Sequence, residues 1–413
     1  MNVPEFFNVL APEEAFEVLR KHLSVRVESE WVPTSKALGR VTAREIRSTE
    51  DLPPFPRSTM DGYSVRAADT FGATEGLPAY LELAGVVPMG AATEVSLGPG
   101  EAAVTFTGGM LADGADAVVM EEYTQHAGGV TVEVLRPVAP GENVLQVGED
   151  VREGNDVLPA GHVIRPQDIG GLMALGITEI EVARRPVVAI VSTGDELVPP
   201  IETPGAGQVR DINTYTISAL VEKHGGVPVP VALVEDDYEA QREAAVDALE
   251  QGDVLVFSAG SSISSRDLTA SVIDSLGSPG VLVHGISLKP GKPTIVALID
   301  GKPAFGLPGN PVSAMVVFNL LVRPTLYLLA GCENPPGPAT LTARLARDVA
   351  SVAGREDHVQ VRLNGTENRR PTAEPVFGKS NLIYSLVRAD GTITVPLDKA
   401  GLYAGENVEV KLF

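Results

Sequence analysis

The chain has 413 residues, a formal net charge of −22 and 44% hydrophobic residues. At roughly 150 residues per domain, this length predicts two to four domains with sizeable cores. A chain this acidic lacks the basic footprint of a nucleic-acid-binding protein. Its one cysteine, Cys332, excludes a disulfide framework and a thiolate zinc site within the chain, and it fits a reducing cytoplasm. No histidine has H-x-x-H or H-E-x-x-H spacing, so any metal is predicted to be a hard cation held by oxygens, such as Mg²⁺.

The first part of the chain combines one predicted helix with many short β patterns. The stretch "PEEAFEVLRKHL" has helical spacing and acidic residues in its first turn. No basic segment precedes the first short apolar run, so no signal peptide is predicted. Between residues 77 and 135, short β patterns alternate with turns, which predicts a β-rich insert.

The stretch "PPFPRSTMDGYSVRAADT", residues 53–70, places Asp61 in an Asp-Gly turn after three prolines in four residues. Proline fixes φ, and Asp-Gly is a strong turn dipeptide. The alternation in "YSVRA" predicts an edge or half-buried strand with Asp61 at its mouth. Taken alone, a turn of this kind is more often an ordinary surface loop than a functional site.

From residue 185 onward, apolar strand patterns alternate with helical patterns, which predicts a doubly wound, mostly parallel sheet. The longest apolar stretch, "AMVVFNLLVRPTLYLLAG", contains Asn319, Arg323 and Pro324. It therefore predicts a buried helix rather than a membrane span. The tail from about residue 336 again shows short β patterns.

Five loops follow the predicted strands of this sheet, and the carboxyl ends of such strands are where ligands bind. They are "STGDEL" (192–197), "EDD" (235–237), "SAGSSISSRD" (258–267), "LKPGKP" (288–293) and "GLPGNPVSA" (306–314). Small residues let backbone N–H groups approach an anion, and helix N-termini add partial positive charge. Each loop alone is more often a plain turn, but five at one sheet edge predict a phosphate or oxyanion site.

Charged residues in these loops divide into two cations and three carboxylates. Lys289 and Lys292 lie three residues apart and would attract an anion. Glu196, Asp237 and Asp267 are predicted to reach the same rim, where carboxylates beside phosphates are expected if Mg²⁺ bridges them.

Six motifs in this order resemble the molybdopterin molybdenumtransferases, the MoeA and gephyrin E-domain family. The motifs are "STMDGYSVRAADT", "TGGMLADGADAVVMEE", "ENVLQVGED", "STGDEL", "LKPGKP" and "GLPGNPVSA". The resemblance covers nearly the whole chain. It implies insertion of molybdate into adenylylated molybdopterin, with release of AMP and the molybdenum cofactor, dependent on Mg²⁺. It also implies a cytoplasmic homodimer with its cleft at the dimer interface, supplied by an upstream molybdopterin adenylyltransferase, without nucleic acid or membrane partners.

The fold that the resemblance implies is a four-domain α/β protein. Residues 1–26 and 185–330 would form a doubly wound, mostly parallel α/β domain that binds the pterin. Residues 27–49 and 147–184 would form a small mixed linking domain, residues 50–146 the inserted β-rich domain carrying the MDGY motif, and residues 331–413 a C-terminal β domain.

The resemblance also assigns roles position by position. Asp61, Glu196, Asp237 and Asp267 match residues tied to activity, and the last three match carboxylates associated with the metal. The substrate-binding positions would be Thr107, Asp150, Ser192, Thr193, Gly194, Asp195, Gly260, Ser261, Lys289, Lys292, Pro308, Gly309, Asn310, Pro311, Ser313, Arg355 and Ser380. Arg355 and Ser380 match tail-domain positions tied to molybdate.

The chain departs from the family pattern at Ala259-Gly260, where Gly-Gly is usual, and at Leu145, where arginine is common. A residue with a Cβ at position 259 limits positive φ there. The sequence does not choose between molybdate and tungstate. Two other functions stay open, a pterin adenylyltransferase that uses ATP and a non-enzymatic scaffold; the inserted domain and tail count against the first, and the retained Asp61 and Lys292 against the second.

Overall fold

The structure, a computed structural model, describes residues 9–25, 27–259, 263–367 and 370–413. The chain divides into two compact units, which are described separately. The larger unit comprises residues 1–44, 160–165 and 180–413, and the smaller unit comprises residues 45–159 and 166–179. The predicted multidomain α/β class is confirmed, whereas the four predicted domain boundaries stay predictions.

A six-stranded sheet forms the centre of the larger unit, in the order β16-β13-β17-β21-β20-β18. Its strands are β13 (Val187–Thr193), β16 (Val227–Val234), β17 (Val254–Ala259), β18 (Pro279–His284), β20 (Ile295–Ile299) and β21 (Lys302–Pro308). Strands β16, β13, β17 and β21 pair in parallel, while β20 is antiparallel to both β21 and β18. β18 therefore runs with the parallel set, and the predicted mostly parallel sheet is confirmed. Pro228 and Pro230 are compatible with β16 because β16 lies at the sheet edge.

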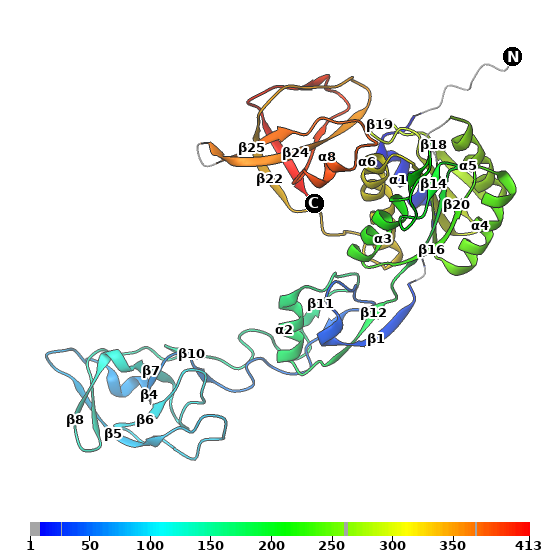
Figure 1. Ribbon diagram of the computed structural model, residues 1–413. Coiled ribbons are helices and arrows are strands. Elements are labelled where there is room, and N and C mark those ends of the chain that lie inside the picture. Colours follow the sequence, from blue (N-terminus) through cyan, green and yellow to red (C-terminus); the bar gives the residue numbers. More distant parts are fainter. Residues whose placement is uncertain (1–8, 26, 260–262, 368–369) are drawn as a thin grey trace. The chain divides into compact units, whose positions relative to one another are not determined.

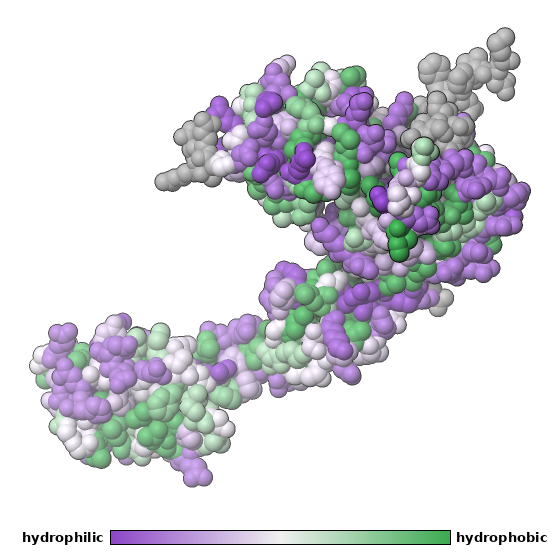
Figure 2. All heavy atoms as spheres, in the orientation of Figure 1, coloured by the Kyte–Doolittle hydropathy of each residue, from purple (hydrophilic) through white to green (hydrophobic). Residues whose placement is uncertain are grey.

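Helices cover both faces of this sheet (Figure 1). One face packs against α1 (Pro12–His22), α3 (Asn213–Lys223), α6 (Pro311–Val317), a π-helical turn (Phe318–Val322) and α7 (Arg323–Leu329). The other face packs against α4 (Tyr238–Gln251) and α5 (Ile263–Ser275). Strand residues alternate between the two cores, with Val188 and Ile190 on one side and Ala189 and Val191 on the other. Figure 2 shows mainly hydrophilic residues on the outer surface of this helical layer, as expected for amphipathic helices.

The apolar segment Pro311–Leu329 is long and apolar enough to cross a membrane by length and composition alone, and 61% of its apolar stretch is buried inside the protein. Phe318, Leu321 and Leu326 belong to the hydrophobic core beneath the sheet. A buried core helix of a globular domain has these properties, which agrees with the sequence-based prediction.

The C-terminal part of the larger unit is a closed β-barrel. Its strands are β22 (Thr340–Leu345), β24 (Glu356–Glu367), β25 (Arg370–Pro375), β26 (Gly391–Val395) and β28 (Asn407–Leu412). The sheet closes because β24 pairs with both β25 and β26. Smaller elements here are β23 (Val349–Ala350), α8 (Tyr384–Val387) and β27 (Gly401–Leu402). A two-residue strand, β19 (Leu288–Lys289), pairs in parallel with β24 and so joins the α/β part to the barrel.

A second six-stranded sheet, ordered β7-β4-β6-β5-β9-β8, forms the smaller unit. Its strands are β4 (Gly62–Val65), β5 (Ala79–Val86), β6 (Glu101–Thr105), β7 (Ala117–Met120), β8 (Thr124–Gly128) and β9 (Thr131–Val134). The predicted β-rich insert is thus present. The predicted edge or half-buried character of the "YSVRA" strand is wrong: β4 pairs on both sides and all four of its residues are buried. Ser64 is buried because Ala112 and its neighbours cover that face, and the Ala112 N–H donates to the Ser64 hydroxyl at 3.4 Å.

Short elements connect these sheets. In the larger unit β1 (Ser29–Pro33) pairs with β12 (Glu179–Ala183). In the smaller unit β2 (Ile46–Arg47) pairs with β11 (Asp156–Leu158), and β3 (Arg57–Ser58) with β10 (Val144–Leu145), beside α2 (Pro166–Ala174). The last two small strands, β14 (Leu197–Val198) and β15 (Val209–Arg210), form a parallel pair in the larger unit.

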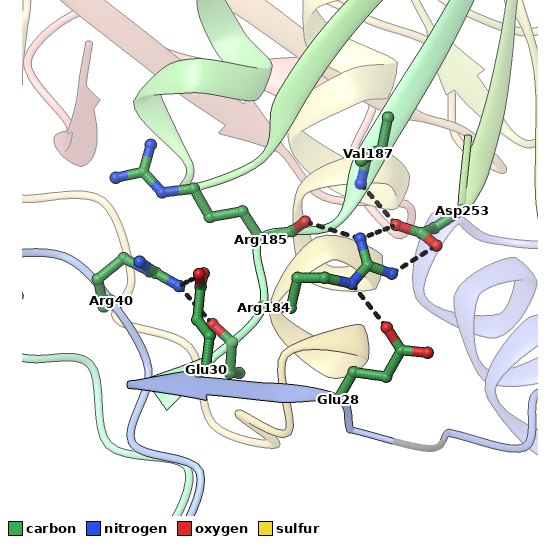
Figure 3. A network of polar contacts seen from close by, with 8 residues as sticks. Glu28, Glu30, Arg40, Arg184, Arg185, Val187 and Asp253 are labelled. Carbon is green, nitrogen blue, oxygen red and sulfur yellow. Dashed lines mark hydrogen bonds and ion pairs between the residues drawn. The ribbon is translucent and has the colours of Figure 1, made fainter. Parts of the chain in front are cut away.

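Arg184 anchors the connection between β12 and β13 (Figure 3). Its guanidinium contacts both carboxylate oxygens of Asp253 at 2.9 and 3.0 Å and the carboxylate of Glu28 at 2.8 Å. Burial alone would raise the pKa of Asp253, but the hydrogen bonds from Arg184 and the Val187 amide lower it overall. A carboxylate with a lowered pKa contributes stability above its unfolded-state pKa and loses it as the pH falls through the folded-state pKa. The linking segment is therefore held most firmly near neutral pH.

Candidate functional site

The five predicted loops begin at one edge of the α/β sheet; residues 260–262 of the loop after β17 lie outside the described residues. They follow the carboxyl ends of β13, β16, β17, β18 and β21, and these strands run in the same direction. The chain crosses from β13 to β16 on one side and then returns to β17 on the other. The gap between β13 and β17 is therefore the topological switch point, where ligands bind in open α/β sheets.

Several residues of the "STGDEL" loop are buried and serve the loop itself. Ser192 and Thr193 are buried, and the Ser192 hydroxyl lies 2.7 Å from that of Thr214. Gly194 has φ +154°, and an added Cβ would lie 2.8 Å from the Glu196 carboxylate, so glycine keeps the turn compact. Asp195 accepts a hydrogen bond from the Asp236 amide at 2.9 Å, which ties this loop to the "EDD" loop.

The predicted metal carboxylates do not form a complete metal site from protein groups. Asp237 is the N-cap of α4, and one oxygen accepts from the amides of Glu239 and Ala240 at 3.1 and 3.0 Å. Glu196 and Asp267 are exposed. Within the described ranges, no group of three or more histidine, cysteine or acidic residues is placed to hold a metal ion. Mg²⁺ is commonly held by one or two carboxylates together with substrate phosphates and water, so the residues fit a metal that arrives with its substrate.

Negative charge nevertheless concentrates beside the switch point. Burial, followed by the nearby carboxylates of Asp195 and Glu196, raises the pKa of Asp236. A raised carboxylate pKa means that the ionised form is disfavoured there. A positive charge on a bound species would therefore stabilise the ionised carboxylates of this loop cluster.

A cavity of about 1240 Å³ lies between the loops after β18 and β21 and the C-terminal barrel. Eight of the predicted substrate-binding residues line it: Lys289, Lys292, Pro308, Gly309, Asn310, Ser313, Arg355 and Ser380. Pro311, also predicted, is buried at the start of α6. The backbone carbonyl of Ser380 accepts from the Val312 amide at 3.2 Å, so the barrel loop is fixed against α6.

Three of the predicted residues, Lys289, Lys292 and Arg355, bring positive charge to this cavity. Lys289 and Arg355 share one buried carboxylate, that of Asp357, at 3.5 Å and 2.8 Å respectively. Lys292 is exposed and lines the same cavity, and in the described part of the chain its ammonium has no carboxylate within ion-pair distance. The cavity therefore offers a partly free positive charge suited to a small oxyanion.

Sequence reasoning missed three groups at this cavity, namely Asp357, His358 and Lys379. His358 is buried, and its ring nitrogen lies 2.5 Å from the carboxylate of Glu356, which lowers the pKa of Glu356. The sequence did contain a signal that Asp357 lies near Arg355. Residues two apart on a strand share a face, and Asp357 follows Arg355 by two positions. The pairing of Lys289 with Asp357 gave no such signal, because it depends on the β19–β24 contact.

The MDGY motif forms a separate cluster in the smaller unit. The Thr107 amide and hydroxyl both donate to one carboxylate oxygen of Asp61, at 2.8 and 3.1 Å. Both residues are exposed, and Asp61 directly precedes β4 as predicted. Asp150 is exposed, and its amide donates to the Leu52 carbonyl at 3.0 Å. Two further predicted residues, Gly260 and Ser261, lie outside the described residues.

Models of a molybdopterin-related family match three consecutive parts of the chain. The MoeA N-terminal region, domains I and II, matches residues 10–176. A probable molybdopterin binding domain matches residues 189–327, and the MoeA C-terminal region, domain IV, matches residues 342–413. These matches define a multidomain molybdopterin-binding class of protein. The chain belongs to the MoeA family, as the motifs predicted.

Relatives are similar over nearly their full length. A putative molybdopterin biosynthesis protein of Methanocaldococcus jannaschii is 36% identical over 411 residues, covering 97% of this chain and 96% of the relative. A molybdopterin molybdenumtransferase of a Nostoc species is 32% identical over 393 residues, covering 94% of this chain and 89% of the relative. The crystal structure of a molybdopterin biosynthesis MoeA protein from Pyrococcus horikoshii has a TM-score of 0.85 at 32% identity, covering 98% of this chain and 100% of that one.

Proposed function

We propose that this protein inserts molybdate into adenylylated molybdopterin and releases AMP and the molybdenum cofactor. The observation that carries the proposal is the cavity in which Lys289, Lys292 and Arg355 gather beside Ser313 and Ser380. Membership of the MoeA family supports the same activity, since a relative from Nostoc carries the name molybdopterin molybdenumtransferase.

In the proposed reaction the cavity binds the oxyanion and the switch-point loops bind the pterin nucleotide. Ammonium and guanidinium groups donate charge-assisted hydrogen bonds to a tetrahedral dianion and hold it where the pterin sulfurs arrive. The loop after β21 leads into α6, where Ser313 lines the cavity and offers a hydroxyl group to a phosphate. Positioning and electrostatic stabilisation of the developing negative charge would supply most of the rate.

The remaining assignments belong to the same proposal. Glu196, Asp237 and Asp267 would face a divalent cation, which when bound neutralises phosphate oxygens. Asp61 would act in the reaction, and Thr107 and Asp150 would bind the substrate. We further propose a cytoplasmic homodimer that receives its pterin from an upstream adenylyltransferase.

The test is release of AMP from adenylylated molybdopterin by the purified protein, with and without molybdate. We expect release that depends on molybdate, because the oxyanion that would bind beside Lys292 and Arg355 is a reactant in the proposed reaction. Consumption of ATP with molybdopterin, and no effect of molybdate, would instead support the adenylyltransferase. Pterin binding without any release of AMP would support the scaffold.

A further inference from the structure

Asp357 lies beneath the cationic wall of the cavity. It is on β24, in register with Lys289 on β19, and its side chain is only 3% exposed. The side chains of Lys289 and Arg355 are 56% and 35% exposed. The anionic group is therefore buried at the base, and the two cationic groups extend from it toward the open space.

The contacts with Arg355 are directional. Nε of Arg355 donates to one oxygen of Asp357 at 2.8 Å, and a terminal nitrogen donates to the other at 3.4 Å. A two-point contact of this kind fixes the plane of the guanidinium. The other terminal nitrogen makes neither of these contacts and is left to donate to a ligand. The Lys289 ammonium lies 3.5 Å from Oδ2 of Asp357, the oxygen that accepts from the terminal nitrogen of Arg355.

We propose that Asp357 is a positioning residue for oxyanion binding, which acts by orienting Arg355 and Lys289 toward the bound anion. This inference rests on the proposed function. It differs from two simpler roles. A carboxylate that only offset the positive charge of the cavity would weaken anion binding, and its removal would tighten it. A carboxylate that only joined β19 to β24 would affect stability and leave the relative affinity for different oxyanions unchanged.

The experiment measures the dissociation constants of molybdate and sulfate by calorimetry on the full-length chain, for wild type and Asp357→Asn. Asparagine keeps the size of the side chain and removes the charge. We expect the dissociation constant for molybdate to rise about 10-fold, as when a group that orients a ligand is lost. We also expect the preference for molybdate over sulfate to fall, because a preorganised site discriminates by geometry.

Arg355→Lys provides a second variant that keeps the charge and loses the two-point contact. The Arg355 side chain is partly exposed, so this substitution should disturb folding less than a substitution of the buried Asp357. If Asp357 acts through Arg355, then Asp357→Asn added to Arg355→Lys will weaken binding much less than it does in the wild type. Glu374→Gln is the matched control, since Glu374 pairs with Arg347 at 2.8 Å on the neighbouring strand and does not line the cavity.

Three outcomes would overturn the inference alone: unchanged or tighter molybdate binding in Asp357→Asn, an unchanged molybdate-to-sulfate ratio, or full additivity with Arg355→Lys. Should Asp357→Asn fail to fold, wild-type affinity in Arg355→Lys would overturn it. A wild-type chain that binds neither molybdate nor tungstate would overturn the proposed function and the inference together.

Discussion

Replacing Lys292 by alanine is expected to reduce molybdate-dependent AMP release by about 10²- to 10³-fold in kcat/KM, the usual cost of losing one group that stabilises developing charge. Lys292 lines the cavity beside Lys289 and Arg355. Those two cations share the carboxylate of Asp357, whereas Lys292 is available to a ligand. The side chain is exposed, so the free energy of unfolding should change little.

Steady-state AMP release at several molybdate concentrations measures this effect. Lys399→Ala is the control, because Lys399 is a half-exposed lysine of the C-terminal part that pairs with Glu406 at 3.9 Å and does not line the cavity. A Lys292→Ala variant that kept activity within twofold of Lys399→Ala would show that the cavity is not where the oxyanion reacts.

Replacing Gly62 by alanine is expected to destabilise the smaller unit by more than about 3 kcal/mol, at the upper end of overpacking effects. A Cβ added at Gly62 would lie 2.0 Å from the Val119 carbonyl oxygen and 3.0 Å from the Glu121 amide. Both atoms are backbone, and Gly62 pairs with Thr105 on one side and Met120 on the other. Strand β4 would have to separate from β7, which carries Val119.

Thermal and urea unfolding of the full chain measure this loss. Gly76→Ala serves as the control, since a Cβ at Gly76 meets no atom within 4 Å. Because Asp61 immediately precedes Gly62 and holds the Thr107 loop, Gly62→Ala should also disorganise that cluster. A variant with wild-type unfolding would show that β4 does not have the close pairing described above.

The α/β alternation predicted the architecture of the larger unit well, because buried parallel strands appear as continuous apolar runs. Strand β17, from Val254 to Ala259, is buried throughout, and it ends at the predicted sheet edge. The common direction of five strands followed from the same pattern. Local sequence was sufficient here because β13, β16, β17 and β21 are each followed along the chain by a helix that packs on the sheet.

The smaller unit was harder to predict because local alternation does not reveal what covers the outer face. Ser64 alternates with Tyr63 and Val65 as an outward residue would, yet it is fully buried. A second hydrophobic cluster, which includes Leu97 and Ala112, belongs to a segment far along the chain. No period in "YSVRA" contains that information.

The cavity could be predicted only in part for the same reason. The lysines of "LKPGKP" and the loop after β21 could be placed at one sheet edge from their strands. The ion pair between Asp357 and Lys289 could not be predicted, because it depends on a two-residue pairing between distant segments. The role of Asp237 as the N-cap of α4 was likewise hidden, since an acidic residue before a helix suits both a cap and a ligand.

The location of bound molybdate tests the central claim most directly. Anomalous scattering at the molybdenum absorption edge, from crystals grown with molybdate, would reveal the metal without any assumption about activity. The account predicts one strong molybdenum peak beside Ser380, placed so that the oxygens of molybdate accept hydrogen bonds from Lys292 and Arg355. A peak elsewhere in the chain, or none in that cavity at saturating molybdate, would contradict it.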